Sequence, residues 1–239
     1  MPEQLFHKQV SNWFKEVVGT PTDIQQQAWT SIQKKEHTLI SAPTGSGKTL
    51  AAFLSIIDDM VKMAMVGQLP EDTMVVYVSP LKALSNDIHK NLQLPLSGIK
   101  HLVENQSNKT MDIRVALRTG DTTNAQRSAM YRKPPHILVT TPESLYLLLT
   151  SGNGRRMLST VGTIIIDEIH AILESKRGAH LALSVARLEK LTQKNLTRIG
   201  LSATQKPIET VAEFLTGSQS CNIVNSGHKR DMDVAIEVT

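Results

Sequence analysis

The chain has 239 residues, a formal net charge of +4 and a sequence pI near 9.2, a composition typical of soluble globular proteins. It contains no run of eighteen apolar residues and no apolar signal core, so we expect no membrane partner, and its only cysteine, Cys221, excludes an intrachain disulfide and fits a reducing cytoplasm. Mild basicity permits nucleic-acid binding, whereas low aromatic content argues against a stacking platform for single strands.

Hydrophobic periodicity predicts helices and strands that alternate along the chain. The predicted helices cover residues 3–18, a segment starting at 21–23, about four turns after residue 48, and residues 81–92, 124–132, 144–149, 181–191 and 207–215. The predicted strands cover residues 38–40, 73–78, 113–117, 137–141, 163–166, 197–201, 221–224 and 234–238. Two polar stretches, 104–110 and 152–156, are predicted as loops.

This alternation predicts the α/β class, with a mostly parallel sheet and helices on both of its faces. No linker divides residues 1–217, which are therefore expected to form one domain. Residues 218–239 begin with a stretch richer in Ser, Asn, Gly and Asp, and they are expected to form a connector or edge strand.

The strongest local pattern is the glycine-rich segment from Ala42 to Thr49, which follows a short apolar strand and opens a helix. Backbone N–H groups can surround a triphosphate only where side chains do not obstruct them, which explains Gly45 and Gly47. Lys48 supplies a full positive charge for the β- and γ-phosphates. The motif's usual first glycine is Ala42 here, and an ordinary glycine-rich turn is the alternative. The residues expected to bind ATP phosphates are Pro43, Thr44, Gly45, Ser46, Gly47, Lys48 and Thr49.

A second pattern is the acidic pair Asp167 and Glu168, which follows the apolar strand at residues 164–166. Open α/β sheets bind ligands at the carboxyl ends of their strands. Asp167 is expected to hold Mg²⁺ together with the Thr49 hydroxyl. Glu168 is expected to act as the general base that orients the attacking water, a contribution of ~10²–10⁴-fold. The alternative is a solvated acidic pair at a strand end.

The phosphate loop, the segment 167–170 and the segment 202–204 resemble, in this order, motifs I, II and III of superfamily 2 helicases. The resemblance implies that His170, Ser202 and Thr204 couple the nucleotide site to nucleic acid. The upstream segment 21–25 resembles the Q motif of these enzymes, which implies that Gln25 reads the adenine edge. An amide suits that role because it can both donate and accept hydrogen bonds.

Three further turns resemble the helicase motifs that hold a nucleic-acid backbone: residues 79–84, 119–121 and 141–143. The implied contacts are Pro80, Lys82, Gly120, Thr141 and Pro142. For each of them, a turn after a strand is the alternative, and Lys82 could equally be a solvated lysine at a helix start. Arg177 is a basic turn residue to which only the resemblance gives a nucleic-acid role.

Four stretches resemble the large helicase-related (Lhr) family: residues 41–54, 77–84, 118–121 with 140–146, and 174–178. The match covers most of residues 20–205 and implies a RecA-like P-loop NTPase domain. It also implies an ATP-driven 3′-to-5′ DNA translocase of bacteria and archaea, cytoplasmic and nucleoid-associated, that unwinds duplexes and RNA–DNA hybrids in DNA repair or recombination. The family's adenine-stacking aromatic has no clear counterpart, because Phe6, Trp13 and Phe14 all fit core packing better.

Motors of this kind need two RecA-like domains, and the second supplies arginine fingers and half of the nucleic-acid groove. The chain ends soon after the third motif, so the expectation is the first motor domain alone, with a second RecA-like domain as its partner. Two other interpretations remain open. One is a DEAD-box-like RNA helicase domain, and the other is a nucleic-acid-binding scaffold that keeps an inherited nucleotide pocket.

Overall fold

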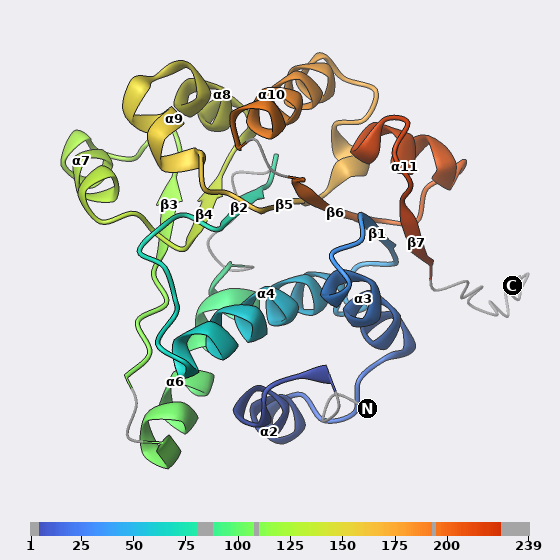
Figure 1. Cartoon of the computed structure of the whole chain (residues 1–239). Coiled ribbons are helices and arrows are strands. Elements are labelled where there is room, and N and C mark those ends of the chain that lie inside the picture. The colour runs from blue at the N-terminus through green and yellow to red at the C-terminus, as the bar shows by residue number, and fades with distance from the viewer. Residues whose placement is uncertain (1–4, 81–87, 108–109, 193–194, 226–239) are drawn as a thin grey trace, which may run out of the picture.

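A computed structural model of the chain describes residues 5–80, 88–107, 110–192 and 195–225 (Figure 1). Lys82, the start of the predicted helix 81–92 and the predicted strand 234–238 lie outside the described residues. No helix in the described part is long and apolar enough to cross a membrane.

The described strands form one sheet of seven strands in the order β3-β4-β2-β5-β6-β1-β7, in which every neighbouring pair is parallel. The strands are β1 (Thr38–Ser41), β2 (Val75–Val78), β3 (Val115–Arg118), β4 (Ile137–Thr140), β5 (Thr163–Ile166), β6 (Thr197–Ser202) and β7 (Asn222–Asn225). The predicted α/β class and parallel sheet are therefore confirmed. β7 is the last strand of the order and pairs with β1, so the described end of the chain is part of the sheet.

Helices cover both faces of the sheet, as predicted (Figure 1). One face carries α2 (Lys8–Val17), α3 (Asp23–Gln33), α4 (Lys48–Met65) and α6 (Leu94–Ser107). The other face carries α8 (Pro142–Thr150), α9 (Gly152–Leu158), α10 (Lys176–Thr192) and α11 (Ile208–Thr216). A short helix, α7 (Asn124–Arg132), follows β3, a π-helical turn (His89–Gln93) precedes α6, and a 3₁₀ turn (Ile169–Ala171) follows β5.

The five inner strands, β4, β2, β5, β6 and β1, are buried on both faces, so their side chains divide between two cores. Ile40, Tyr77 and Ile165 belong to the core beneath α3 and α4, whereas Leu39 and Ile164 belong to the core beneath α8 and α10. This explains why the strands appear in the sequence as short continuous apolar runs rather than as alternating patterns. The sheet is thereby clamped between two helical layers, which fixes the positions of its strand ends.

The prediction of a loop at residues 104–110 is wrong for residues 104–107, because α6 continues to Ser107. Pro95 and Gly98 conceal this helix in the sequence, although Leu96, Ile99 and Val103 have helical spacing and are buried. Gly98 serves a tertiary contact. A Cβ atom there would lie 2.3 Å from Nε1 of Trp13, so only glycine lets α2 approach α6 this closely.

The loop predicted at residues 152–156 is also wrong, because these residues form the first turn of α9. Its two glycines suggested a loop, but the Ser151 hydroxyl accepts a hydrogen bond from the Gly154 N–H and caps the helix. The apolar residues Met157 and Leu158 then bury the other end of α9 in the core. Helix α10 likewise begins at Lys176, earlier than the predicted residue 181.

Candidate functional site

Strand order brings three sequence motifs to one edge of the sheet. Strands β5, β6 and β1 are neighbours, so the acidic pair, the segment 202–204 and the phosphate loop all follow adjacent carboxyl ends. Backbone hydrogen bonds continue past the strands: the Ala42 N–H donates to the Ser202 carbonyl at 3.1 Å, and the Asp167 N–H donates to the Val78 carbonyl at 2.8 Å. Together with the pairing of β6 to both β1 and β5, these bonds hold the three motifs in fixed register.

The phosphate loop joins the end of β1 at Ser41 to the start of α4 at Lys48. Gly45 has φ +85° and Gly47 has φ +81°, conformations that glycine adopts without strain. Lys48 is only 5% exposed and occupies the first turn of α4, where the helix N-terminus also favours an anion. The buried Ser46 hydroxyl has no hydrogen-bond partner among the described residues. These features fit the phosphates of a nucleotide.

Gln25 braces the phosphate loop from α3. Its Oε1 accepts the Thr22 N–H at 3.0 Å in a capping box, and its Nε2 donates to the Gly47 carbonyl at 3.5 Å. A Cβ atom on Gly47 would lie 2.5 Å from that Nε2, so a larger residue at position 47 would displace the Gln25 amide. The amide oxygen and nitrogen each keep one further hydrogen-bonding position, which leaves adenine recognition open to this side chain.

Asp167 is a buried carboxylate held by two donors. The Tyr77 hydroxyl donates to its Oδ2, and the Glu168 N–H donates to its Oδ1 at 2.8 Å. Burial raises the pKa of the Asp167 carboxyl above its ordinary value, against the opposing effects of the Tyr77 hydrogen bond and the Lys48 charge. Such a carboxylate gains from a nearby cation, and with the Thr49 hydroxyl it offers the oxygen ligands that Mg²⁺ prefers.

Tyr77 was not anticipated from the sequence, and it leads to a first prediction. Tyr77→Phe is expected to weaken Mg²⁺-dependent ATP binding by about tenfold, since a hydrogen bond to a charged group contributes roughly 1.5–3 kcal/mol. Without this donor, the pKa of Asp167 rises further. As the pH is lowered, the variant should therefore lose Mg²⁺-dependent ATP binding at a higher pH than wild type. ATP titrations at several pH values measure both effects, with Tyr131→Phe on α7 as the control. Equal pH profiles for wild type and Tyr77→Phe would contradict the assigned contact.

Glu168 and His170 connect the acidic pair to the segment after β6. Glu168 has φ +50°, an uncommon conformation for a residue other than glycine, and its Oε2 lies 3.1 Å from Nε2 of His170. His170 Nδ1 accepts the Ala203 N–H at 3.0 Å. A neutral His170 therefore carries its hydrogen on Nε2, and this N–H donates a hydrogen bond to the Glu168 carboxylate. This chain of contacts joins the proposed general base to the end of β6.

The remaining residues of the predicted coupling set are placed nearby. The buried Ser202 hydroxyl donates to the Ala203 carbonyl at 2.9 Å, which stiffens the turn that His170 contacts. Thr204 is exposed at the surface of the same turn. Of this set, only His170 makes a direct side-chain contact with the acidic pair in the described structure.

A groove of about 510 Å³ lies at the carboxyl ends of three further strands, β3, β4 and β2. Its lining includes three of the predicted nucleic-acid residues, Pro80, Gly120 and Thr141. Pro142 instead starts α8 and is buried, and Lys82 lies outside the described residues. Arg177 crosses the groove, where it donates to Glu143 Oε1 at 2.7 Å and to the Pro80 carbonyl at 3.1 Å.

The groove also contains two exposed leucines, Leu117 and Leu147, which the sequence did not mark as functional residues. Both leucines belong to apolar runs in the sequence, which gave no sign of their exposure. The phosphate loop and this groove occupy one edge of the same sheet, on opposite sides of the boundary between β2 and β5. Fold and site together define a RecA-like P-loop nucleotide-binding domain with an adjoining groove.

The family model for DEAD/DEAH box helicases matches residues 22–214, and the chain belongs to this family. The chain is 46% identical to the ATP-dependent helicase Lhr-Core of Methanothermobacter thermautotrophicus, covering 96% of this chain and 27% of that protein. It is 44% identical to the Lhr helicase/uracil glycosylase of Escherichia coli, covering 98% of this chain and 15% of that protein. The expected resemblance to a first RecA-like domain of the Lhr family is therefore confirmed.

Solved structures agree with this assignment. The structure of Mycobacterium smegmatis helicase Lhr bound to ssDNA and AMP-PNP matches with a TM-score of 0.86 at 48% identity, over 94% of this chain and 28% of that one. The DEAD-box helicase Mss116, at 19% identity and a TM-score of 0.75, shares the fold. The chain thus spans about a quarter or less of the length of these Lhr relatives.

Proposed function

We propose that this chain is the ATP-loading motor domain of an Lhr-type helicase. One observation supports this proposal: two sites lie at the same edge of the sheet. The phosphate loop lies beside the acidic pair, and the groove lined by Pro80, Gly120 and Thr141 lies on the other side of the boundary between β2 and β5. ATP use by the chain is supported by its family and by a relative whose structure contains AMP-PNP.

In the proposed mechanism, the loop amides and Lys48 bind the phosphates of ATP, and Gln25 contacts its base. Asp167 and Thr49 would hold Mg²⁺, which would neutralise the charge of the phosphates. Glu168 orients the attacking water and takes its proton. His170, hydrogen-bonded to both Glu168 and the Ala203 backbone, would transmit a change at the nucleotide site to the end of β6.

The proposed substrate is DNA, including RNA–DNA hybrids, along which the whole protein moves 3′ to 5′. The support is similarity to a helicase whose structure was solved with single-stranded DNA. We also propose that the protein works in DNA repair or recombination in the cytoplasm of a bacterium or archaeon, near the nucleoid. The named Lhr relatives come from bacteria and archaea.

A second RecA-like domain is the proposed partner, with residues 218–239 as the connector toward it. The relatives are several times longer than this chain, which leaves room for such a domain. An arginine finger contributes ~10³–10⁵ in rate in comparable phosphoryl transfers. The chain by itself is therefore expected to bind ATP weakly and to hydrolyse it poorly.

Strand binding tests the proposed substrate. Gly120→Glu places a negative charge in the groove and should weaken single-stranded DNA binding about tenfold, because carboxylate and phosphate repel. A Cβ atom at Gly120 meets nothing within 4 Å, so the fold should tolerate the change. Gly162→Glu is the matched control, since it has the same free space at the amino end of β5.

Fluorescence anisotropy with labelled DNA measures these affinities, and unlabelled RNA of the same sequence serves as competitor. If about three phosphates are contacted, the log–log slope of affinity against salt should be near −2. Preferential binding of RNA would favour the RNA-helicase alternative. If both glycine variants lost DNA affinity equally, the groove would not be the site that binds the DNA strand.

A further inference from the structure

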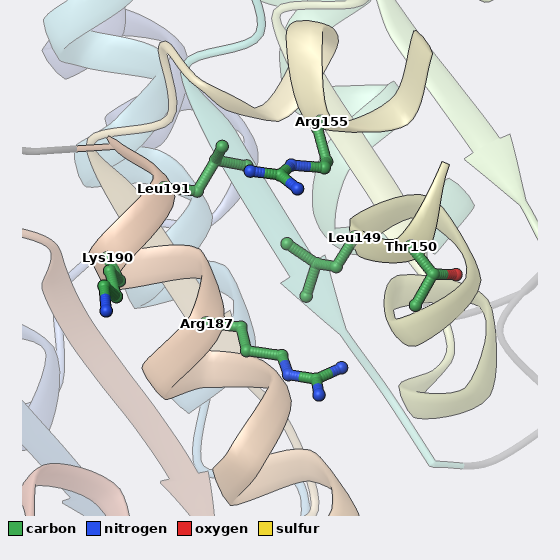
Figure 2. Close-up of a pocket in the computed structure, with 6 residues that line it drawn as sticks. All are labelled: Leu149, Thr150, Arg155, Arg187, Lys190 and Leu191. Carbon is green, nitrogen blue, oxygen red and sulfur yellow. The ribbon is translucent and has the colours of Figure 1, made fainter. Parts of the chain in front are cut away.

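A basic hollow of about 530 Å³ lies between α8, α9 and α10, on the outer helical layer (Figure 2). Two leucines, Leu149 and Leu191, form its apolar floor, with Thr150 beside them. Arg155 extends over this floor from α9, and Arg187 extends from α10 on the other side, as Figure 2 shows. Lys190 completes the lining. Nothing in the proposed helicase mechanism uses this hollow.

The three cations of the hollow lack carboxylate partners. Elsewhere in the described chain, basic side chains such as Lys62, Arg114 and Arg198 pair with carboxylates. Within the part of the chain that the structure describes, no ion pair involves Arg155, Arg187 or Lys190, and no acidic residue lines the hollow. Gathering three like charges without a counter-charge is unfavourable, so the arrangement favours an anionic ligand.

Arg187 is held in place rather than free in solvent. Its guanidinium carbon lies 5.5 Å from the centre of the Tyr146 ring, a cation–π arrangement. Tyr146 in turn packs against His180, with ring centres 4.6 Å apart. A guanidinium stacked in this way keeps its N–H edge available for bidentate hydrogen bonds to a carboxylate.

Helix electrostatics account for only part of this cluster. Lys190 and Arg155 lie in the last turns of α10 and α9, where the helix dipole favours a cation. That effect does not explain Arg187, nor the meeting of Arg155 and Arg187 around an apolar floor, with Lys190 at the edge of the hollow.

The lining of the hollow argues against a strand-binding role. The hollow adjoins the groove along α8, where Leu147 lines the groove and Leu149 and Thr150 line the hollow. The floor is leucine rather than an aromatic stacking surface, which suits an apolar amino-acid side chain better than a base.

We propose that this hollow is a docking site for an acidic protein segment. The segment's carboxylates pair with Arg155, Arg187 and Lys190, and an apolar side chain of the segment packs on Leu149 and Leu191. The charges set orientation and association rate, while the leucine floor selects segments that combine Glu or Asp with an apolar residue.

The test uses a fluorescein-labelled peptide of Glu and Leu residues and anisotropy measurements on the wild-type chain. We expect saturable binding that weakens as salt is raised, at least tenfold tighter than that of a peptide of Lys and Leu. Replacing Leu by Ser in the probe should weaken binding severalfold, because the apolar contact is lost. Absence of saturable binding, or equal affinity for the Glu and Lys peptides, would overturn the proposal.

The double variant Arg155→Glu/Arg187→Glu should lower peptide affinity at least tenfold. The double variant Lys34→Glu/Arg156→Glu is the matched control, because it changes the net charge by the same amount at two exposed residues that do not line the hollow. Circular dichroism checks that both variants fold, and the Leu-to-Ser probe tests the site without any change to the chain. If the double variant instead loses single-stranded DNA affinity and keeps the peptide, the hollow is a nucleic-acid site and the proposal is wrong.

Discussion

Lys48→Met is expected to reduce ATP affinity by about a hundredfold or more. Lys48 is buried at the start of α4, where the exposed fraction of its side chain is only 5%. A charge-assisted contact to phosphate in such a site contributes more than an exposed ion pair does, and a hundredfold corresponds to about 2.8 kcal/mol. Because the change is nearly isosteric, the fold should survive, and thermal unfolding without ligand checks this.

The control for this variant is Lys34→Met, at the exposed C-terminal end of α3. It removes the same charge from the chain but should leave ATP affinity unchanged. Nucleotide titration by calorimetry compares the two variants directly. If both lost affinity equally, the effect would come from net charge, and if neither did, the phosphate loop would not be the nucleotide site.

Glu168→Gln is expected to keep ATP affinity within a few-fold of wild type and to lower hydrolysis by the full-length protein by ~10²–10⁴-fold. Glutamine cannot accept the proton of the attacking water. Its amide oxygen can still accept the hydrogen bond from His170 Nε2, which lies 3.1 Å from the Glu168 carboxylate. The substitution therefore separates loss of the base from loss of the contact that links β5 to β6.

Single-turnover hydrolysis and nucleotide titration on the same samples distinguish the two effects. Glu209→Gln, an exposed residue in the first turn of α11, is the matched control and should hydrolyse ATP at the wild-type rate. Wild-type hydrolysis by Glu168→Gln would remove Glu168 from the mechanism. A strong loss of ATP affinity would instead assign it to nucleotide binding.

The phosphate loop could be located from the sequence because its geometry is local. A strand, two glycines with positive φ and a helix start occupy only a dozen consecutive residues, and each residue type has its own physical reason. The acidic pair was found for the same reason, at the end of a short apolar strand. Both predictions needed no knowledge of which strands are neighbours in the sheet.

Contacts between distant segments could not be predicted in this way. Tyr77 and Asp167 are 90 residues apart and meet only because β2 lies beside β5 in the sheet. The sequence showed Tyr77 only as one more apolar member of a buried strand. Gly98 shows the same limit, since it marks the approach of Trp13 from α2, a contact between distant segments.

The central claim is that the phosphate loop and the acidic pair form one Mg²⁺-dependent ATP site. The most direct measurement is calorimetric titration of the wild-type chain with ATP, first in Mg²⁺ and then in excess chelator. The placement of Lys48 and Thr49 at the start of α4 and of Asp167 after β5 predicts saturable one-site binding in Mg²⁺ that weakens at least tenfold when the cation is removed. Binding that is absent in both conditions, or identical in both, would contradict the claim.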